Sequence, residues 1–416
     1  MDPANKKLKV LKVIHGYPPY YMAGSEVYTH NLCKELSKTC DVAIFTRIED
    51  EFRSPYEVQE SKEEGIHIIR VNKPSRDYTF RSKCIDEKMT QIFETHLKEI
   101  NPDVVHIGHL SHLTVRIVEK IKKHKIPILF TLHDFWMMCV RGQLIRDDLT
   151  RCEGPDIEKC ARCNQKYFTS IEEAKKEIQL WVEEMERINR QIDLFIAPSR
   201  FLRKKYIDYG IPPEKILYFD YGFDKQLFEN IKKKPSHKVR FGFLGRIIKV
   251  KGITTLIEAF NGIKNSKAEL NIYGRLPNSS IYLKERCTNP HINFQGSYDY
   301  EEISQVLANI DVLVVPSVWY ENSPLVIHEA FLAGIPVITS NLGGMAELVR
   351  DGQNGLLFTP GNAADLREKL CRFIDHPELI EKLASDSGCV RSIQEDAKKL
   401  KELYKQLTFG GKLIVH

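Results

Sequence analysis

Short segments rich in β-branched and apolar residues alternate with amphipathic helical segments along most of this chain. The first series of such segments reads LKVLKVIHG, DVAIFTR, GIHIIRV, DVVHIGHL, IPILFTLHD and DLFIAPS. A second series begins at Val239 and reads VRFGFLGRI, AELNIYG, INFQGS, DVLVVPS, PVITS and GLLFTP. Helical patterns such as TVRIVEKIKKHK lie between several of these strands, and this alternation predicts parallel sheets covered by helices.

The length of 416 residues is too great for a single hydrophobic core and suits two domains. The change between the two series falls near residues 218–236, where YFDYGFDKQLFENIKKKPS reads as a linker with a basic run. We therefore expect two doubly wound α/β domains, at residues 1–220 and 221–392. Ligands of such sheets bind beyond the carboxyl ends of the strands, so two facing domains would place a site in the cleft between them.

The charge and composition of the chain exclude several classes of protein. The formal net charge is only +5, whereas a dedicated nucleic-acid binder carries a strong basic stripe, so we expect no nucleic-acid partner. The amino-terminal segment lacks the long apolar core of a secretory signal. No apolar run approaches the roughly 20 residues that span a bilayer. The sequence thus predicts a soluble or peripherally attached protein that tolerates anionic substrates or an anionic membrane surface.

Two glutamates eight positions apart, Glu321 and Glu329, flank the start of a predicted helix in the segment ENSPLVIHEAFLAG. We expect Ser323 to cap this helix, Pro324 to occupy its first turn and Gly334 to end it. The first amides of a helix attract phosphate, and the two carboxylates can accept hydrogen bonds from sugar hydroxyls. The pattern indicates a site for a sugar attached to a phosphate, although two glutamates at this spacing are also common by chance.

A basic loop, GRIIKVKG, follows the strand VRFGFL and precedes the amphipathic run ITTLIEAF. Arg246 and Lys251 therefore lie in one strand-to-helix connection, where both side chains can converge on a diphosphate. The planar guanidinium of arginine grips two oxygen atoms, and lysine supplies a compact point charge. Taken alone, such a loop is more often a solvated basic turn.

Three other loops carry weaker signals for the same kind of site. In HGYPPYYMAGSE, Gly24 lets the backbone approach a ligand, but the three-glycine spacing of a dinucleotide-binding loop is missing. In TLHDFW, His133 stands at the carboxyl end of a strand, where a lone histidine is more often structural. In LGGMAE, Gly343 and Gly344 predict a tight turn before Glu347, which opens the next helix.

Together these motifs resemble retaining glycosyltransferases of family 4, which have the two-domain GT-B fold. The resemblance covers nearly the whole chain and is most specific from Gly245 to Gly361. It implies that a final helix, within residues 393–416, crosses back to the first domain. The catalytic set that it implies is His133, Arg246, Lys251 and Glu321. The implied donor-binding set is Gly24, Arg246, Lys251, Asn322, Ser323, Pro324, Leu325 and Glu329.

By this resemblance the chain is an enzyme that moves a sugar from a UDP-, GDP- or ADP-sugar to an acceptor hydroxyl with retention of configuration. Glu321 would face the transferred sugar and Glu329 would hold the ribose of the nucleotide. No Asp-x-Asp motif lies near the donor helix, so cations and amides would replace a divalent ion, with no cofactor required for the chemistry. The acceptor would be a glycan, a lipid-linked or a small molecule. The protein would be cytoplasmic, and a peripheral contact with the inner face of the membrane is compatible with this expectation.

Two other functions stay open at this point. A sugar-nucleotide epimerase of the same fold would hydrolyse or isomerise its donor without an acceptor. An epimerase would require acid–base carboxylates and histidines around the sugar. The presence of Arg246 and Lys251 in one loop makes the epimerase reading less favoured than transfer. A non-catalytic sugar-nucleotide-binding protein would be expected to lose the two basic residues and the glutamates Glu321 and Glu329, all of which are present.

Four of the ten cysteines lie within 25 residues: Cys139, Cys152, Cys160 and Cys163. A Cys-x-x-Cys pair with two more thiols nearby fits a structural zinc site with tetrahedral coordination. The segment between the outer cysteines has little periodicity, and a bound metal would supply free energy to order it. A disulfide, which is unusual in the cytosol, and an ordinary packed loop are the alternatives.

Overall fold

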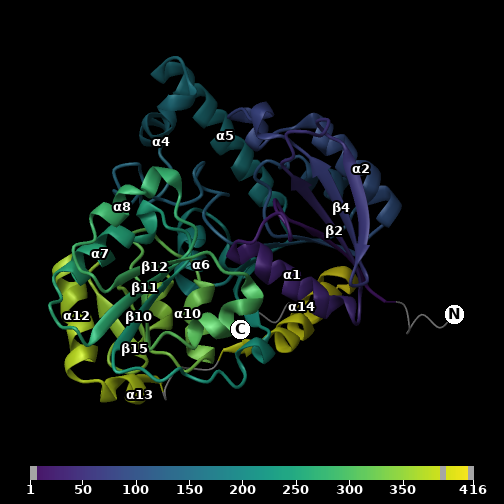
Figure 1. Ribbon diagram of the computed structural model, residues 1–416. Coiled ribbons are helices and arrows are strands. Elements are labelled where there is room, and N and C mark those ends of the chain that lie inside the picture. The colour runs from purple at the N-terminus through teal and green to yellow at the C-terminus, as the bar shows by residue number, and fades with distance from the viewer. Residues whose placement is uncertain (1–6, 385–389, 411–416) are drawn as a thin grey trace. The chain divides into compact units, whose positions relative to one another are not determined.

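The computed structural model describes residues 7–384 and 390–410, and these residues form two compact units (Figure 1). The first unit comprises Met1–Leu144, Cys152–Phe223 and Arg391–His416, as far as they are described. The second unit comprises Ile145–Arg151 and Asp224–Val390. The chain passes between the units after residues 144, 151, 223 and 390, so Ile145–Arg151 lies outside the unit that contains most of residues 1–220.

The first unit is built on an eight-stranded sheet with the strand order β3-β4-β2-β1-β5-β6-β7-β8. The strands are β1 (Lys9–Val13), β2 (Asp41–Ile48), β3 (Val58–Glu63), β4 (Ile66–Asn72), β5 (Val104–Ile107), β6 (Ile128–Thr131), β7 (Leu194–Ala197) and β8 (Ile216–Tyr218). All neighbours are parallel except β3 and β4, which pair antiparallel. Strands β5, β6 and β7 are buried along their full length, as expected for a parallel sheet with helices on both faces.

The helices of this unit start mainly at side-chain caps. They are α1 (Gly24–Ser37), α2 (Glu87–Ile100), α3 (Ile117–Lys123), α4 (Ile157–Asn164), α5 (Ile171–Gln191) and α6 (Arg200–Asp208). The side chain of Asp86 accepts a hydrogen bond from the Met89 amide at the start of α2, and Ser199 accepts one from Leu202 at the start of α6. Such caps satisfy amides that have no partner within the helix, so the sequence itself fixes where these helices begin.

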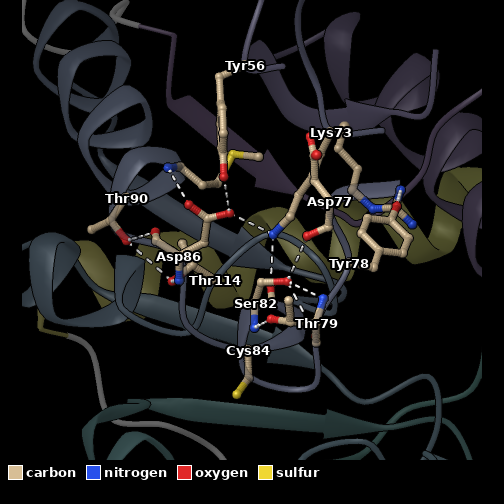
Figure 2. Close-up of polar contacts among 12 residues, drawn as sticks. Tyr56, Lys73, Asp77, Tyr78, Thr79, Ser82, Cys84, Asp86, Thr90 and Thr114 are labelled. Atoms are coloured by element: carbon tan, nitrogen blue, oxygen red, sulfur yellow. Dashed lines mark hydrogen bonds and ion pairs between the residues drawn. The ribbon is translucent and has the colours of Figure 1, made fainter. Parts of the chain in front are cut away.

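A buried ion pair holds the connection between β4 and α2 (Figure 2). Lys73 Nζ lies 2.7 Å from Asp86 Oδ2 and donates to the Ser82 carbonyl oxygen at 2.7 Å. The hydroxyl of Tyr56 donates to the same carboxylate oxygen at 2.9 Å. Both charged side chains are almost fully buried, so the remaining hydrogen bonds are needed to offset their loss of water.

The last described helix, α14 (Ile393–Phe409), packs against α1 within the first unit. Just before it, β16 (Arg391–Ser392) pairs with β9 (Gly222–Phe223) in a separate two-stranded sheet. The carboxylate of Asp396 in α14 accepts hydrogen bonds from the Tyr28 hydroxyl at 2.9 Å and from the Gly222 amide at 3.1 Å. The predicted return of the final helix to the first domain is thus confirmed; residues 411–416 of the predicted range lie outside the described part.

The second unit contains a six-stranded, fully parallel sheet in the order β12-β11-β10-β13-β14-β15. Its strands are β10 (Val239–Leu244), β11 (Ala268–Tyr273), β12 (Ile292–Gly296), β13 (Val312–Val315), β14 (Val337–Ser340) and β15 (Gly355–Phe358). Its helices are α7 (Ile253–Asn261), α8 (Tyr282–Glu285), α9 (Ile303–Leu307), α10 (Leu325–Leu332), α11 (Met345–Leu348), α12 (Ala363–Asp375) and α13 (Glu378–Ala384).

Because β10, β13 and β14 are adjacent and parallel, the loops that follow them leave the sheet at one edge. These loops carry the basic residues, the first glutamate and the glycine pair that the sequence marks as a site. In the described part of the chain, no helix is both long and apolar enough to cross a membrane.

Candidate functional site

Three loops of the second unit interlock at the carboxyl edge of its sheet. The Val318 amide, in the loop after β13, donates to the Val250 carbonyl oxygen of the loop after β10 at 2.9 Å. Gly252 in the β10 loop has a positive φ of 71°, and a Cβ at this position would lie 1.8 Å from the Pro316 carbonyl oxygen. Only glycine permits this approach, so the first two loops are held together by their backbones.

The loop after β14 supports the same region from the other side. The Gly344 amide donates to the Glu321 carbonyl oxygen at 3.0 Å. A Cβ on Gly344 would fall 1.4 Å from the Asn322 carbonyl oxygen, which leaves no room for any other residue. The predicted turn at Gly343 and Gly344 is therefore a support for the backbone of Glu321 and Asn322, and Glu347 lies in the first turn of α11, as predicted.

The carboxylate of Glu321 is buried and is held through one of its oxygens. Its Oε1 accepts hydrogen bonds from Lys251 Nζ at 2.7 Å, from the Ser317 hydroxyl at 2.7 Å and from the Trp319 indole nitrogen at 2.8 Å. The ammonium of Lys251 also lies 5.7 Å from the centre of the Trp319 ring. The structure thus joins two predicted site residues, Lys251 and Glu321, and adds Ser317 and Trp319. Sequence reasoning missed these two, and their closeness to Glu321 in PSVWYE was the one available signal.

Arg246 lies in the same loop as Lys251, and its side chain is exposed. Within the described residues it makes no hydrogen bond or ion pair through its guanidinium. Its convergence with Lys251 on a diphosphate therefore stays a prediction.

Helix α10 begins at Leu325, one residue later than a Ser323 cap requires. Its cap position is Pro324, which has extended backbone angles and makes no side-chain cap bond. The cap position is thus Pro324 and not the predicted Ser323, whose hydroxyl bonds with His328 Nε2 at 2.8 Å. The end of the helix is as predicted: Gly334 has a positive φ of 61° directly after the last turn.

Glu329 lies within α10, is buried and faces two tyrosines of the loop after β12. Burial raises the pKa of Glu329 to about 7, and a hydrogen bond with the Tyr300 side chain acts in the opposite direction. The charge of Glu329 in turn adds to the burial that raises the pKa of both Tyr298 and Tyr300. The sequence marked Glu329 but not its tyrosine partners, since SYDYEE carries no pattern that points to a site.

Two predicted residues belong to the first unit. His133 follows β6 and bonds through Nδ1 with the Tyr221 hydroxyl at 2.8 Å, while the two rings stack with centres 5.7 Å apart. Burial lowers the pKa of His133 well below its usual value, so the imidazole is neutral at physiological pH. Gly24 is the exposed first residue of α1, which begins after Ala23 without a side-chain cap.

His133 also lines a small hollow of the first unit that has room for about one water molecule. Its polar lining includes His109, Asp134 and Trp136. His109 Nε2 lies 3.3 Å from Asp134 Oδ2. This hollow at the carboxyl end of β5 and β6 offers donors and acceptors suited to hydroxyl groups.

The four clustered cysteines are partly buried and reduced. Cys160 and Cys163 lie on α4; burial raises the pKa of the Cys139 thiol, and the backbone amides of residues 141–144 act in the opposite direction. Burial raises the pKa of Cys160 to about 11, and the nearby thiols of Cys139, Cys152 and Cys163 add to this effect. The four thiols are therefore neighbours. Among residues 7–384 and 390–410, however, no group of three or more His, Cys, Asp or Glu side chains has the arrangement of a metal site.

Two family models match consecutive parts of the chain. The model for glycosyltransferase family 4 matches residues 22–226, and the model for glycosyl transferases group 1 matches residues 224–387. Among known proteins, an uncharacterized 42.6 kDa protein in the cps region of Klebsiella pneumoniae is 23% identical, with 80% of this chain and 85% of the relative covered. Glycogen synthase of Mycobacterium tuberculosis is 21% identical, with 91% of this chain and 88% of the relative covered.

Solved structures share the fold over almost the whole chain. Sucrose-phosphate synthase from Thermosynechococcus elongatus superposes with a TM-score of 0.72 at 19% identity. The match covers 97% of this chain and 100% of the synthase chain. Anabaena HepE in complex with UDP and glucose has a TM-score of 0.67 at 18% identity, with 96% of this chain and all of its own covered. The predicted GT-B fold is confirmed by these likenesses and by the two parallel sheets. Since the two family models together span residues 22–387, the chain belongs to the family 4 glycosyltransferases.

Proposed function

We propose that this chain is a retaining glycosyltransferase that moves a sugar from a nucleoside diphosphate to an acceptor hydroxyl, with no divalent ion in the chemistry. The observation that carries the proposal is the contact of 2.7 Å between Lys251 and Glu321 in the interlocked loops of the second unit. A cation for phosphate and a carboxylate for sugar hydroxyls thereby stand side by side on a rigid backbone. A donor made of a sugar on a diphosphate needs that pair.

The charge that develops on the departing diphosphate requires nearby donors. In the proposal these are Lys251, the exposed Arg246 of the same loop and the amides at the start of α10. Preorganised donors of this kind are usually the largest contribution to catalysis, because they need no reorganisation during the reaction. The amides at the start of α10 begin with that of Leu325, directly after Asn322, Ser323 and Pro324.

The departing phosphate would accept the proton of the attacking hydroxyl on the same face of the sugar, which gives retention. His133 would contact the sugar or the acceptor as a neutral hydrogen-bonding group, with its orientation held by Tyr221. The hollow beside His133 would admit no more than one hydroxyl group of the acceptor. Gly24 would let the first loop approach the donor phosphates.

Glu329 would bind the ribose hydroxyls, since it is a buried carboxylate in the helix that follows the phosphate-binding loop. Anabaena HepE binds UDP and UDP-glucose, which makes UDP the first nucleotide to consider for this chain, followed by GDP and ADP. The acceptor would be a glycan, a lipid-linked or a small molecule. We place the reaction in the cytoplasm, and at the inner face of the membrane if the acceptor is lipid-linked.

The proposal is tested first by thermal shift with UDP-, GDP- and ADP-sugars and then by product analysis. We expect one nucleotide class to raise the melting temperature, and an acceptor screen with that donor to yield a product of the same anomeric configuration by NMR. At saturating acceptor, turnover should be unchanged by EDTA. An inverted product would refute retention, and loss of turnover in EDTA that added Mg²⁺ restores would refute metal-independent chemistry.

The same assay separates the two alternatives. An epimerase would convert the nucleotide sugar into an isomer when no acceptor is present. A binding protein would show the thermal shift without consuming the donor under any condition.

A further inference from the structure

All of the hydrogen bonds that described residues make to the Glu321 carboxylate reach one of its two oxygens. Lys251, Ser317 and Trp319 all donate to Oε1, at 2.7, 2.7 and 2.8 Å. Within the described part of the chain, Oε2 has no hydrogen bond or ion pair. The carboxylate is thus held through Oε1, and Oε2 is available to a ligand.

The three donors differ in what a bound diphosphate would do to them. The ammonium of Lys251 has three N–H groups and would turn part of its charge toward the phosphate oxygens. The hydroxyl of Ser317 can rotate and can also accept hydrogen bonds. The indole N–H of Trp319 is a donor only, on a rigid ring, so its bond to Glu321 has one direction and one geometry.

The backbone reinforces the position of Trp319. The Glu321 amide donates to the Trp319 carbonyl oxygen at 3.0 Å, which closes a tight turn between the two residues. The preceding residue, Val318, is tied to the loop of Lys251 at Val250. The indole is therefore held relative to both the carboxylate and the phosphate-binding loop.

We propose that Trp319 is a positioning residue: its indole N–H keeps Glu321 Oε1 in place when Lys251 engages the diphosphate, so that Oε2 faces the donor sugar. This inference rests on the proposed function, and it names the residue that would make Glu321 productive. Trp319 itself would not contact the phosphates, so its loss should affect turnover and spare nucleotide binding.

The test replaces Trp319 by Phe, which keeps one aromatic ring near Lys251 and removes the N–H together with the five-membered ring that carries it. Crystal structures of the wild-type protein and the variant, with UDP, should show Glu321 in one side-chain conformation in the former and in a shifted or mixed one in the latter. Loss of one hydrogen bond to a carboxylate should lower kcat about tenfold to a hundredfold, measured as hydrolysis or transfer from UDP-glucose. The Kd for UDP should change by less than about twofold, whereas a lost phosphate contact weakens binding about tenfold or more.

Three further variants sharpen the result. Arg246→Ala should show the opposite pattern: the Kd for UDP should rise, and the Glu321 side chain should keep its wild-type conformation. Trp181→Phe, in α5 of the first unit, is the control for a tryptophan-to-phenylalanine change as such. Trp319→Gln restores an N–H donor without the ring and should recover part of the turnover that Phe loses.

An unshifted Glu321 with undiminished turnover in Trp319→Phe would overturn the inference. A Gln variant less active than the Phe variant would also overturn it, because the ring rather than the N–H would then be decisive. If the wild-type protein neither binds UDP nor uses UDP-glucose, the choice of donor in the proposed function fails. The conformation of Glu321 in ligand-free crystals of the two proteins still decides the role of Trp319.

Discussion

At the scale of single residues, Glu329 is the group whose chemistry depends most on its surroundings. Its folded pKa of about 7 is raised above the ordinary 4.5 by burial. The folded protein therefore holds the proton more tightly than the unfolded chain. Its contribution to the free energy of unfolding is present below pH 4.5 and is lost as the pH rises through about 7.

We expect this titration to appear in nucleotide binding. An ionised carboxylate accepts stronger hydrogen bonds from ribose hydroxyls than the protonated acid does. The affinity for UDP, measured by calorimetry, should increase between pH 6 and pH 8 in the wild-type protein more than in Glu329→Gln.

The phosphate of UDP titrates in the same range, but it does so equally with both proteins, so the difference between them isolates Glu329. Parallel pH profiles would show that this carboxylate does not bind the ribose. Glu321→Gln serves as the matched variant, since its binding of UDP should retain the wild-type pH profile.

At the scale of elements, the sequence predicted what local patterns determine. The alternation of strands and helices and the end of α10 at Gly334 follow from periodicity and from glycine. The start of α10 did not, because the cap position is Pro324 and the Ser323 hydroxyl bonds with His328. The donors around Glu321 and the tyrosines beside Glu329 come from loops whose approach depends on strand order, which no local pattern encodes.

The zinc site in the cysteine segment between β6 and α5 remains a prediction. The closeness of the four thiols fits a shared site, although the described side chains do not have the arrangement of a metal site. We predict about one zinc per chain by elemental analysis of protein purified without chelators, the stoichiometry of one four-ligand site.

Removing that metal should raise the KM for the acceptor and leave the affinity for UDP nearly unchanged, because the segment follows His133 in the first unit. Replacement of Cys287, which lies outside the cluster, is the control and should leave the zinc content as it is. Metal-free protein with four freely titratable thiols would reduce the segment to an ordinary loop, and a disulfide would appear as two thiols lost from that titration.

At the scale of the whole molecule, the chain leaves the first unit after Phe223 and returns to it at Arg391. The return depends on a buried carboxylate: Asp396 is fully buried, and its Oδ2 accepts from both the Tyr28 hydroxyl and the Gly222 amide. Gly222 is required for this contact, since a Cβ there would lie 2.5 Å from the Asp396 Cβ. The stability of the first unit is thus coupled to a helix that follows the second unit in sequence.

We therefore predict that Asp396→Ala destabilises the first unit selectively. Two buried donors lose their acceptor, at about 1–3 kcal/mol each. Hydrogen exchange should rise in β1, α1 and α14, while β10, β13 and α10 of the second unit keep their protection.

Asp396→Asn is the control: it can retain both bonds through its amide oxygen. Burial raises the pKa of Asp396 to about 6 from 3.8, so the aspartate loses stability as the pH rises across that interval, and the asparagine does not. The Asn variant should accordingly gain on the wild-type protein between pH 4 and pH 7 in urea unfolding. Equal loss of protection in both units would mean that they unfold as one cooperative body rather than through the anchoring of α14.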